Sequence, residues 1–238
     1  MRIFPDNLKS SYLSKVKIFI GTHIINRYYH KSYSQEGEDM ILRRIFENNK
    51  NGFYVDVGAY HPKLFSNTYF FYKKGWRGIN IEPNPESIQL FNAQRYMDIN
   101  LSVGVSNIPS ERIYYMFNEP ALNTFEENIA KMSSRSGEQY YQIGKIPVKV
   151  RRLETILEEN LPKDQNIDFI SIDVEGHELN VIQSNDWEKF RPKCLLVEVL
   201  ESNIQSIMQS QLHGCMTAAN YTLYAKTANT IFYMDKYR

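Results

Sequence analysis

The sequence predicts one α/β domain with a mostly parallel sheet and helices on both faces. Its 238 residues fit a single domain of ordinary size. Short apolar runs rich in valine and isoleucine recur along the chain without polar alternation, and segments of helical periodicity separate them. A strand that is apolar on both sides is buried on both faces, and a helix between consecutive strands makes their pairing parallel.

Strands and helices are expected to alternate along most of the chain. The expected strands are residues 52–58, 78–83, 99–105, 113–117, 168–173 and 194–199. The expected helices begin within residues 34–39 and cover residues 66–74, 85–96, 153–161, 178–187 and 201–212. Residues 221–225 and 230–234 indicate a terminal hairpin, which supplies an antiparallel edge.

Two segments depart from this alternation. Residues 1–33 are basic with apolar residues at near-helical spacing, which predicts a helical extension that packs on its own domain or on a dimer mate. The alternative is an amphipathic helix on an anionic membrane surface. Residues 118–146 are polar, serine-rich and without period over most of their length, and are interpreted as a lid or an insertion.

Composition excludes several classes of protein. Lys and Arg number 28 against 27 Asp and Glu, and this balance argues against binding nucleic acid through bulk charge. Cys194 and Cys215 have no zinc or disulfide-scaffold spacing. No apolar run approaches the roughly 18 residues of a membrane span. The expectation is a cytoplasmic protein without a membrane span or a nucleic-acid partner.

Polar residues follow the ends of the expected strands. They are Asp56 and Gly58, Glu82, Ser106, Asp173 with Glu175 and His177, and Glu198. Ligands of a parallel sheet bind beyond the carboxyl ends of its strands. Clustered carboxylates are costly in a purely structural sheet because they repel one another and lose hydration. The pattern therefore favours a site for a cation or for several hydroxyl groups.

The loop after the first strand discriminates among nucleotide ligands. It holds only Gly58, whereas dinucleotide-binding folds use G-x-G-x-x-G to approach a pyrophosphate. Asp56 would repel a phosphate, so a nicotinamide oxidoreductase is disfavoured. S-adenosylmethionine, a cation without phosphate, suits one glycine and an acid. Glu82 is then placed to accept hydrogen bonds from both ribose hydroxyls.

Five segments carry a resemblance to a known family. They are Ser34-Gln35-Glu36-x-Glu38-Asp39, residues 53–59, Ser66-Asn67-Thr68, residues 78–84 and residues 172–178. Together they resemble the FkbM family of S-adenosylmethionine-dependent methyltransferases, over about Ser34 to Glu198. The resemblance implies a class I methyltransferase (Rossmann-like) sheet of seven strands in residues 34–238. It also implies O-methylation of hydroxyl groups, mainly on sugars and polyketides.

The resemblance assigns cofactor contacts residue by residue. It implies that Asp56 and Gly58 border the methionine end, that Glu82 holds the ribose and that Ser106 lies near the adenine. Asp173 also borders the cofactor, and three further residues cover the cofactor or the acceptor: Gln35, Asn67 and Thr68. The alternatives are an ordinary charged helix start at Gln35 and a capping group at Asn67.

Two catalytic schemes are open at the end of the fourth parallel strand. In the first, His177 is a general base oriented by Asp173 or Glu175. In the second, Asp173, Glu175 and Glu198 bind Mg²⁺ or Mn²⁺, which acidifies the acceptor hydroxyl. Each residue also has a purely structural alternative. His177 would then be a solvent-facing residue at a helix start, and Glu198 a buried acid paired with a nearby cationic side chain.

The expected function is O-methyl transfer from S-adenosylmethionine to a carbohydrate hydroxyl in polysaccharide or glycan biosynthesis. The expected acceptor is thus a glycan or another small molecule. The alternatives are methylation of a lipid, a polyketide or a peptide group, and a non-catalytic module that binds S-adenosylmethionine.

Overall fold

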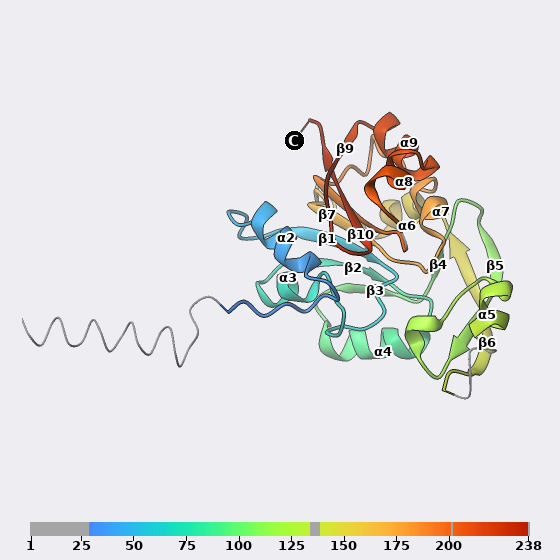
Figure 1. Cartoon of the computed structure of the whole chain (residues 1–238). Helices are drawn as coiled ribbons and strands as arrows, with labels where there is room; N and C mark the ends of the chain where they lie inside the picture. Colours follow the sequence, from blue (N-terminus) through green and yellow to red (C-terminus); the bar gives the residue numbers. More distant parts are fainter. Residues whose placement is uncertain (1–28, 134–138, 201, 238) are drawn as a thin grey trace, which may run out of the picture. The chain divides into compact units, whose positions relative to one another are not determined.

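Figure 1 shows the computed structural model, which describes residues 29–133, 139–200 and 202–237. Residues Tyr33–Arg238 form one compact unit. The expected helical extension, with its dimer or membrane role, falls almost entirely on residues 1–28 and so lies outside the described residues. Among the described residues, no helix has the length and apolar character to span a bilayer.

The unit is built on a seven-stranded sheet in the order β3-β2-β1-β7-β8-β10-β9. Its strands are β1 (Phe53–Val57), β2 (Arg77–Ile81), β3 (Ile99–Leu101), β7 (Phe169–Ile172), β8 (Cys194–Glu198), β9 (Tyr221–Lys226) and β10 (Thr230–Asp235). The first five are parallel, and β10 pairs antiparallel with β8 and β9. The predicted mostly parallel sheet with a closing hairpin is confirmed.

The register of the central strands brings their ends to the same level. Val57 of β1 pairs with Ile81 of β2 on one side and with Ile172 of β7 on the other. The residues that follow them, Gly58, Glu82 and Asp173, therefore emerge side by side at the carboxyl edge. Strand order also reverses here, because the chain passes from β1 outward to β3 and returns to β7 on the other side.

Helices cover both faces because successive side chains of each strand point to opposite sides. Phe53, Val55 and Val57 pack with apolar residues of α6 (Leu153–Asn160), α7 (Glu178–Ile182), α8 (Ile204–Met208) and α9 (Gln211–Ala218). Tyr54 packs on the other face with residues of α2 (Glu38–Ile45), α3 (Tyr69–Lys73) and the adjoining Trp76. Asp56 shares the face of Tyr54.

Helix α4 (Pro85–Gln94) follows β2 and begins where the local sequence directs it to begin. Asn84 is the N-cap, and its side chain accepts a hydrogen bond from the amide of Glu86 at 3.0 Å. Pro85 takes the first helical position, where its missing N–H costs nothing. The helix ends at Gln94 and leaves Arg95 as its C-cap.

A second, three-stranded sheet corrects two of the expected elements. It consists of β4 (Gly104–Val105), β5 (Ser110–Phe117) and β6 (Gln142–Arg151), in the order β4-β6-β5. The expected strand 99–105 is therefore two strands, β3 and β4, in different sheets. The expected irregular stretch contains a 3₁₀ turn (Pro120–Leu122), α5 (Glu127–Ser133) and the start of β6. The expected helix 201–212 is divided between α8 and α9.

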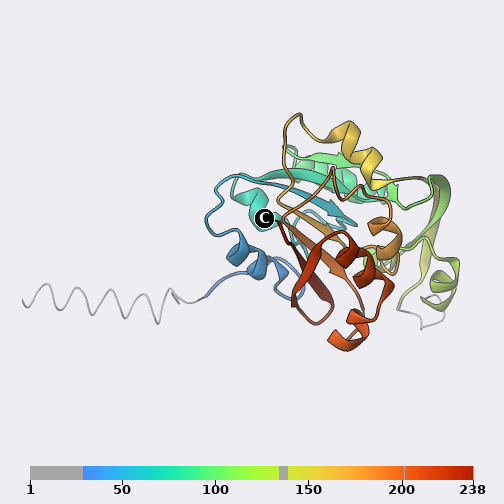
Figure 2. The same cartoon turned by 90° about the horizontal axis from the view of Figure 1, so that it is seen from above.

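Strand β6 was not expected from the sequence because it is polar, whereas β4 and part of β5 fall within expected strands. Of the ten residues of β6, only Val148 and Val150 are buried, so the strand has no apolar run. Both views place this sheet, with α5, at one side of the main sheet (Figures 1 and 2).

Candidate active site

A cavity of about 300 Å³ lies at the carboxyl edge of the main sheet. It brings together nine of the residues that the sequence singled out: Gln35, Asp56, Gly58, Asn67, Glu82, Asp173, Glu175, His177 and Glu198. Two others, Thr68 and Ser106, do not line it and instead contact residues that do. Strand β5 and the segment between β5 and β6 supply further lining, notably Tyr114 and Phe125.

Gly58 allows the backbones of three strands to meet at the floor of the cavity. Its φ is +79°, in the left-handed region that favours glycine. Its amide donates to the carbonyl of Ile81 at 2.9 Å. A Cβ at this position would lie 1.6 Å from the carbonyl oxygen of Asp173. The position therefore excludes any side chain and exposes bare backbone to a ligand.

Glu82 is a buried acid at the end of β2, with 5 % of its surface exposed. Its Oε2 accepts from the amide of Tyr60 at 3.0 Å and its Oε1 from the amide of Asn84 at 2.8 Å. The Tyr114 hydroxyl, from β5, lies near the same carboxylate and lowers its pKa. Burial raises the pKa of Glu82 to about 7, although these hydrogen bonds oppose the rise.

Asp56 lies beside Asn67 and Thr68, two of the three residues predicted to cover the cofactor or the acceptor. The Thr68 hydroxyl donates to Asp56 Oδ2 at 2.6 Å, and Thr68 itself is fully buried. Asn67 lines the cavity, and its Nδ2 donates to the Ser171 hydroxyl of β7 at 3.0 Å. Burial raises the pKa of Asp56, while the Thr68 hydrogen bond and the charge of Arg95 lower it.

Three carboxylates form an acidic cluster at the ends of β7 and β8. Oxygens of Asp173, Glu175 and Glu198 lie within 4.8 Å of one another. Burial first, and then the charge of Glu198, raises the pKa of Asp173 well above its usual value. Burial and the neighbouring acids Glu198 and Glu178 raise the pKa of Glu175 to about 7. The cluster therefore retains protons near neutral pH and is suited to hydrogen-bonding hydroxyls or to holding a cation.

His177 lies at the other side of the cavity, beside the second sheet. Its Nε2 lies 3.1 Å from the Ser106 hydroxyl and 3.1 Å from Nη1 of Arg112. A guanidinium only donates, so the Nε2 lone pair faces Arg112 and the neutral ring carries its proton on Nδ1. Glu126 Oε1 lies 3.7 Å from Nδ1. Burial, followed by the charge of Arg112, lowers the pKa of His177, and Glu126 opposes this.

The neighbours of His177 differ from the predicted ones. Among the described residues, the ring's hydrogen bonds go to Ser106, Arg112 and Asn180, not to Asp173 or Glu175. Ser106, predicted to lie near the adenine, is 5 % exposed and sits behind this ring. The imidazole and the acidic cluster are thus two separate groups at the rim of one cavity.

Sequence reasoning missed the aromatic residues of the cavity. Tyr114 and Phe125 pack with their ring centroids 4.8 Å apart. Tyr60, whose φ is +53°, stacks on Phe65 at 6.2 Å and also lines the cavity. Tyr60 could have been found as the second residue after Gly58. Tyr114 could not, because its place depends on the second sheet.

The sheet order and the cavity at its reversal define a class I methyltransferase. The sequence profile of the methyltransferase FkbM domain matches residues 56–221. The chain therefore belongs to the FkbM family of methyltransferases, and it is an S-adenosylmethionine-dependent methyltransferase.

Solved methyltransferase structures resemble the chain at low sequence identity. A TehB-like enzyme from Corynebacterium glutamicum has a TM-score of 0.43 at 6% identity, covering 98% of this chain and 100% of its own. A 1,6-didemethyltoxoflavin-N1-methyltransferase from Burkholderia thailandensis gives 0.42 at 9%, covering 99% and 92%. An O-methyltransferase from Bacillus cereus gives 0.41 at 13%, covering 98% and 94%. None of the curated proteins matches the chain in sequence.

Proposed function

We propose that the protein transfers the methyl group of S-adenosylmethionine to a hydroxyl oxygen of a carbohydrate, in polysaccharide or glycan biosynthesis. The observation that carries this proposal is the acidic cluster of Asp173, Glu175 and Glu198 beside the Gly58 loop. Carboxylates accept hydrogen bonds from hydroxyls, which sugars carry in number. The cluster thus supplies a proton acceptor where an acceptor hydroxyl would meet the methyl group.

The residues of the cavity fit the cofactor. A volume of about 300 Å³ falls at the lower end of ligand pockets, which run to about 1,000 Å³. Gly58 offers bare backbone at the predicted methionine end, and Asp56 offers a negative charge there. Glu82 would accept the ribose hydroxyls at the end of β2. When bound, S-adenosylmethionine supplies a methyl group on a positively charged sulfur.

Methyl transfer requires that the reacting atoms be held in line and that the acceptor hydroxyl lose its proton. The acceptor oxygen forms a bond to the methyl carbon as the carbon–sulfur bond breaks, and the hydroxyl proton passes to a carboxylate. Holding the reacting groups in line can supply roughly 7–11 kcal/mol. A general base adds about 10²–10⁴-fold. Glu175, with a pKa of about 7, is matched to this task near neutral pH.

His177 is the second candidate base. Its Nε2 lone pair faces Arg112, so the imidazole becomes a base for the acceptor only when that contact opens. Until then it is better placed to orient the acceptor beside Ser106. We therefore assign removal of the acceptor proton to the carboxylates and not to His177. The charge of Glu198 raises the pKa of Asp173, one of these carboxylates.

A divalent cation is the alternative occupant of the acidic cluster. Three carboxylates with oxygens within 4.8 Å suit Mg²⁺ or Mn²⁺, which prefer oxygen ligands, and a cation would relieve their mutual repulsion. Asp173, Glu175 and Glu198 would hold the ion, which when bound lowers the pKa of a coordinated hydroxyl.

Both cysteines are free thiols, which supports a reducing compartment, the cytoplasm.

The acceptor class is tested by following the methyl carbon. The full chain is incubated with S-adenosylmethionine labelled at the methyl with ¹³C and with oligosaccharides, glycolipids, polyketides or peptides in separate reactions. A methoxy carbon signal on an oligosaccharide supports the proposal, and transfer only to a lipid tail, a polyketide or a peptide group contradicts it. Activity that a chelator abolishes and Mg²⁺ or Mn²⁺ restores would assign the metal scheme, and unchanged activity the base scheme.

A further inference from the structure

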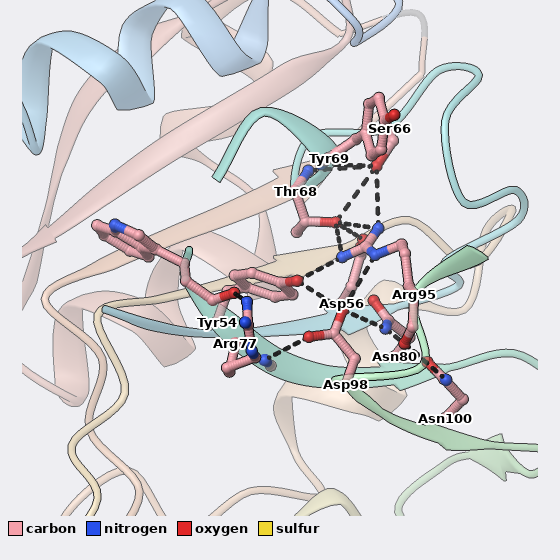
Figure 3. Close-up of polar contacts among 12 residues, drawn as sticks. Tyr54, Asp56, Ser66, Thr68, Tyr69, Arg77, Asn80, Arg95, Asp98 and Asn100 are labelled. Carbon is pink, nitrogen blue, oxygen red and sulfur yellow. Dashed lines mark hydrogen bonds and ion pairs between the residues drawn. The ribbon is translucent and has the colours of Figure 1, made fainter. Parts of the chain in front are cut away.

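Arg95 is fully buried at the end of α4, and Figure 3 shows it at the centre of a group of polar side chains that includes the cavity-lining Asp56. Its guanidinium carries five N–H groups, and it donates five hydrogen bonds to neighbouring side chains. Nε donates to Asp98 Oδ2 at 3.0 Å, Nη1 to Thr68 at 3.0 Å and to Ser66 at 3.5 Å, and Nη2 to Thr68 at 3.0 Å and to Tyr54 at 2.6 Å. A guanidinium is stable in the interior only when its donors are satisfied in this way.

Two hydroxyl groups connect the Arg95 guanidinium to two carboxylates through hydrogen bonds. The Thr68 oxygen accepts from Arg95 twice, so its single proton points to Asp56 Oδ2 at 2.6 Å. The Tyr54 oxygen accepts from Arg95 and donates to Asp98 Oδ2, also at 2.6 Å. Thr68 and Tyr54 therefore play the same chemical role, Thr68 toward Asp56, which lines the cavity, and Tyr54 toward Asp98 (Figure 3).

The two carboxylates differ in how many hydrogen bonds their oxygens accept. Asp98 accepts from the amide of Gly78 on Oδ1 and from Asn80, Tyr54 and Arg95 on Oδ2. Asp56 accepts from Thr68 on Oδ2, and no described residue donates to its Oδ1. Asp56 lines the cavity, so Oδ1 is the oxygen left for a ligand.

The charges of the group do not cancel. Arg95 carries one positive charge, and ionised Asp98 and Asp56 carry two negative charges. Arg95 and Asp98 are in direct contact with each other, and both side chains are fully buried. Their charges therefore neutralise each other. The remaining negative charge sits on Asp56 at the cavity wall, where a cationic ligand would balance it.

We propose that Arg95 is a positioning residue for the cofactor: through the Thr68 hydroxyl it holds the Asp56 carboxylate so that Oδ1 faces the ammonium group of the methionine end. This rests on the proposed placement of S-adenosylmethionine in the cavity. Burial alone would protonate Asp56 and remove the negative charge. The hydrogen bond from Thr68 and the charge of Arg95 oppose that protonation. The buried cation thus keeps the anion at the cavity wall.

The test compares two variants that each remove one hydroxyl from Arg95. Thr68→Val deletes the link to Asp56, and the matched control Tyr54→Phe deletes the link to Asp98. S-adenosylhomocysteine, which carries the same ammonium group, is titrated calorimetrically into the full chain across pH 5–9. We expect Thr68→Val to weaken binding about tenfold near pH 7.5 and to move the acidic limb of the affinity profile up by about one pH unit.

The control fixes the interpretation. Tyr54→Phe lowers thermal stability but leaves the affinity and its pH profile as in the unmodified chain. Glu82 titrates in the same cavity and contributes one limb common to all variants. Asp98 and Arg95 also act on the Asp56 charge, and both remain in either variant. An equal shift in both variants would overturn the proposal and reduce Arg95 to a structural ion pair.

Two further variants separate the loss of the Thr68 hydroxyl from a failure to fold. Thr68→Ser retains the hydroxyl and should bind as the unmodified chain does. If Thr68→Val does not fold, Thr68→Ala removes the same hydroxyl and should show the same shift. A folded variant without this hydroxyl and with an unaltered pH profile would overturn the proposal. Failure of the unmodified chain to bind S-adenosylhomocysteine would instead refute the proposed cofactor site.

Discussion

Carboxyl oxygens of Asp173 and Glu198 lie within 4.8 Å of each other at the ends of the neighbouring strands β7 and β8. Two carboxyl groups this close cannot both ionise at low cost, so the pair retains a proton to higher pH than a lone carboxyl group. The pair lies beside Gly58, whose loop borders the predicted methionine end of the cofactor. The acidic cluster is therefore adjacent to the point where the methyl group would be transferred.

Glu198→Gln should move the acidic limb of the pH–rate profile to lower pH. The charge of Glu198 raises the pKa of Asp173, so its removal lowers that pKa and ionises Asp173 under more acidic conditions. The measurement is kcat/KM from pH 5 to 9. A limb that stays in place would remove the pair from the reaction.

Glu175→Gln should stabilise the folded protein at pH 8. The pKa of Glu175 rises from 4.5 to about 7 on folding, so its contribution to stability is present below about 4.5 and is lost as the pH rises through about 7. At about 1.4 kcal/mol per unit, the gain reaches up to about 3 kcal/mol. Urea unfolding at pH 8 and pH 4 measures it, with the exposed Glu86→Gln as the control. Equal stabilities at pH 8 would contradict the burial of this charge.

The pKa of His177 should move in opposite directions in two variants. Arg112→Met removes a positive charge that lowers it and should raise it, whereas Glu126→Gln removes a negative charge and should lower it further. Titration of the imidazole by NMR measures both, and neither readout requires an acceptor. Shifts of the same sign in both variants would rule out the assigned neighbours.

Gly58→Ala should destabilise the protein far more than Gly75→Ala. Both glycines have positive φ, +79° and +97°, so each alanine costs about 1–2 kcal/mol in backbone strain. Only at Gly58 does the new Cβ meet the Asp173 backbone, whereas nothing lies within 4 Å at Gly75. Thermal unfolding compares the two variants, and similar losses would mean that the strands separate easily here.

The main sheet could be predicted because its strands are buried on both faces and end in acids. Parallel pairing then places Gly58, Glu82 and Asp173 together without further information. The second sheet could be predicted only in part, because β4 and part of β5 fall within expected strands, whereas β6 is polar and buries only two of its side chains. The surroundings of His177 follow from that sheet, since Arg112 belongs to β5.

The network beneath the cavity was also beyond sequence reasoning. Arg95 has the sequence signature of an ordinary charged residue at a helix end, and such residues are usually exposed. Its burial depends on Tyr54 and Thr68, which lie 41 and 27 residues away in the chain. Thr68 was singled out by resemblance, but its role beneath Asp56 appears only in three dimensions.

The proposed function depends on the binding of S-adenosylmethionine in the cavity, with Glu82 on the ribose. Calorimetric titration of the full chain with S-adenosylhomocysteine and, separately, with NAD tests it most directly, using Glu82→Gln and the control Glu86→Gln. Hydrogen bonds to a charged group are each worth about 1.5–3 kcal/mol, so Glu82→Gln should weaken S-adenosylhomocysteine binding at least about tenfold while Glu86→Gln leaves it unchanged. NAD binding tighter than S-adenosylhomocysteine, or an unchanged affinity in a folded Glu82→Gln variant, would contradict the account.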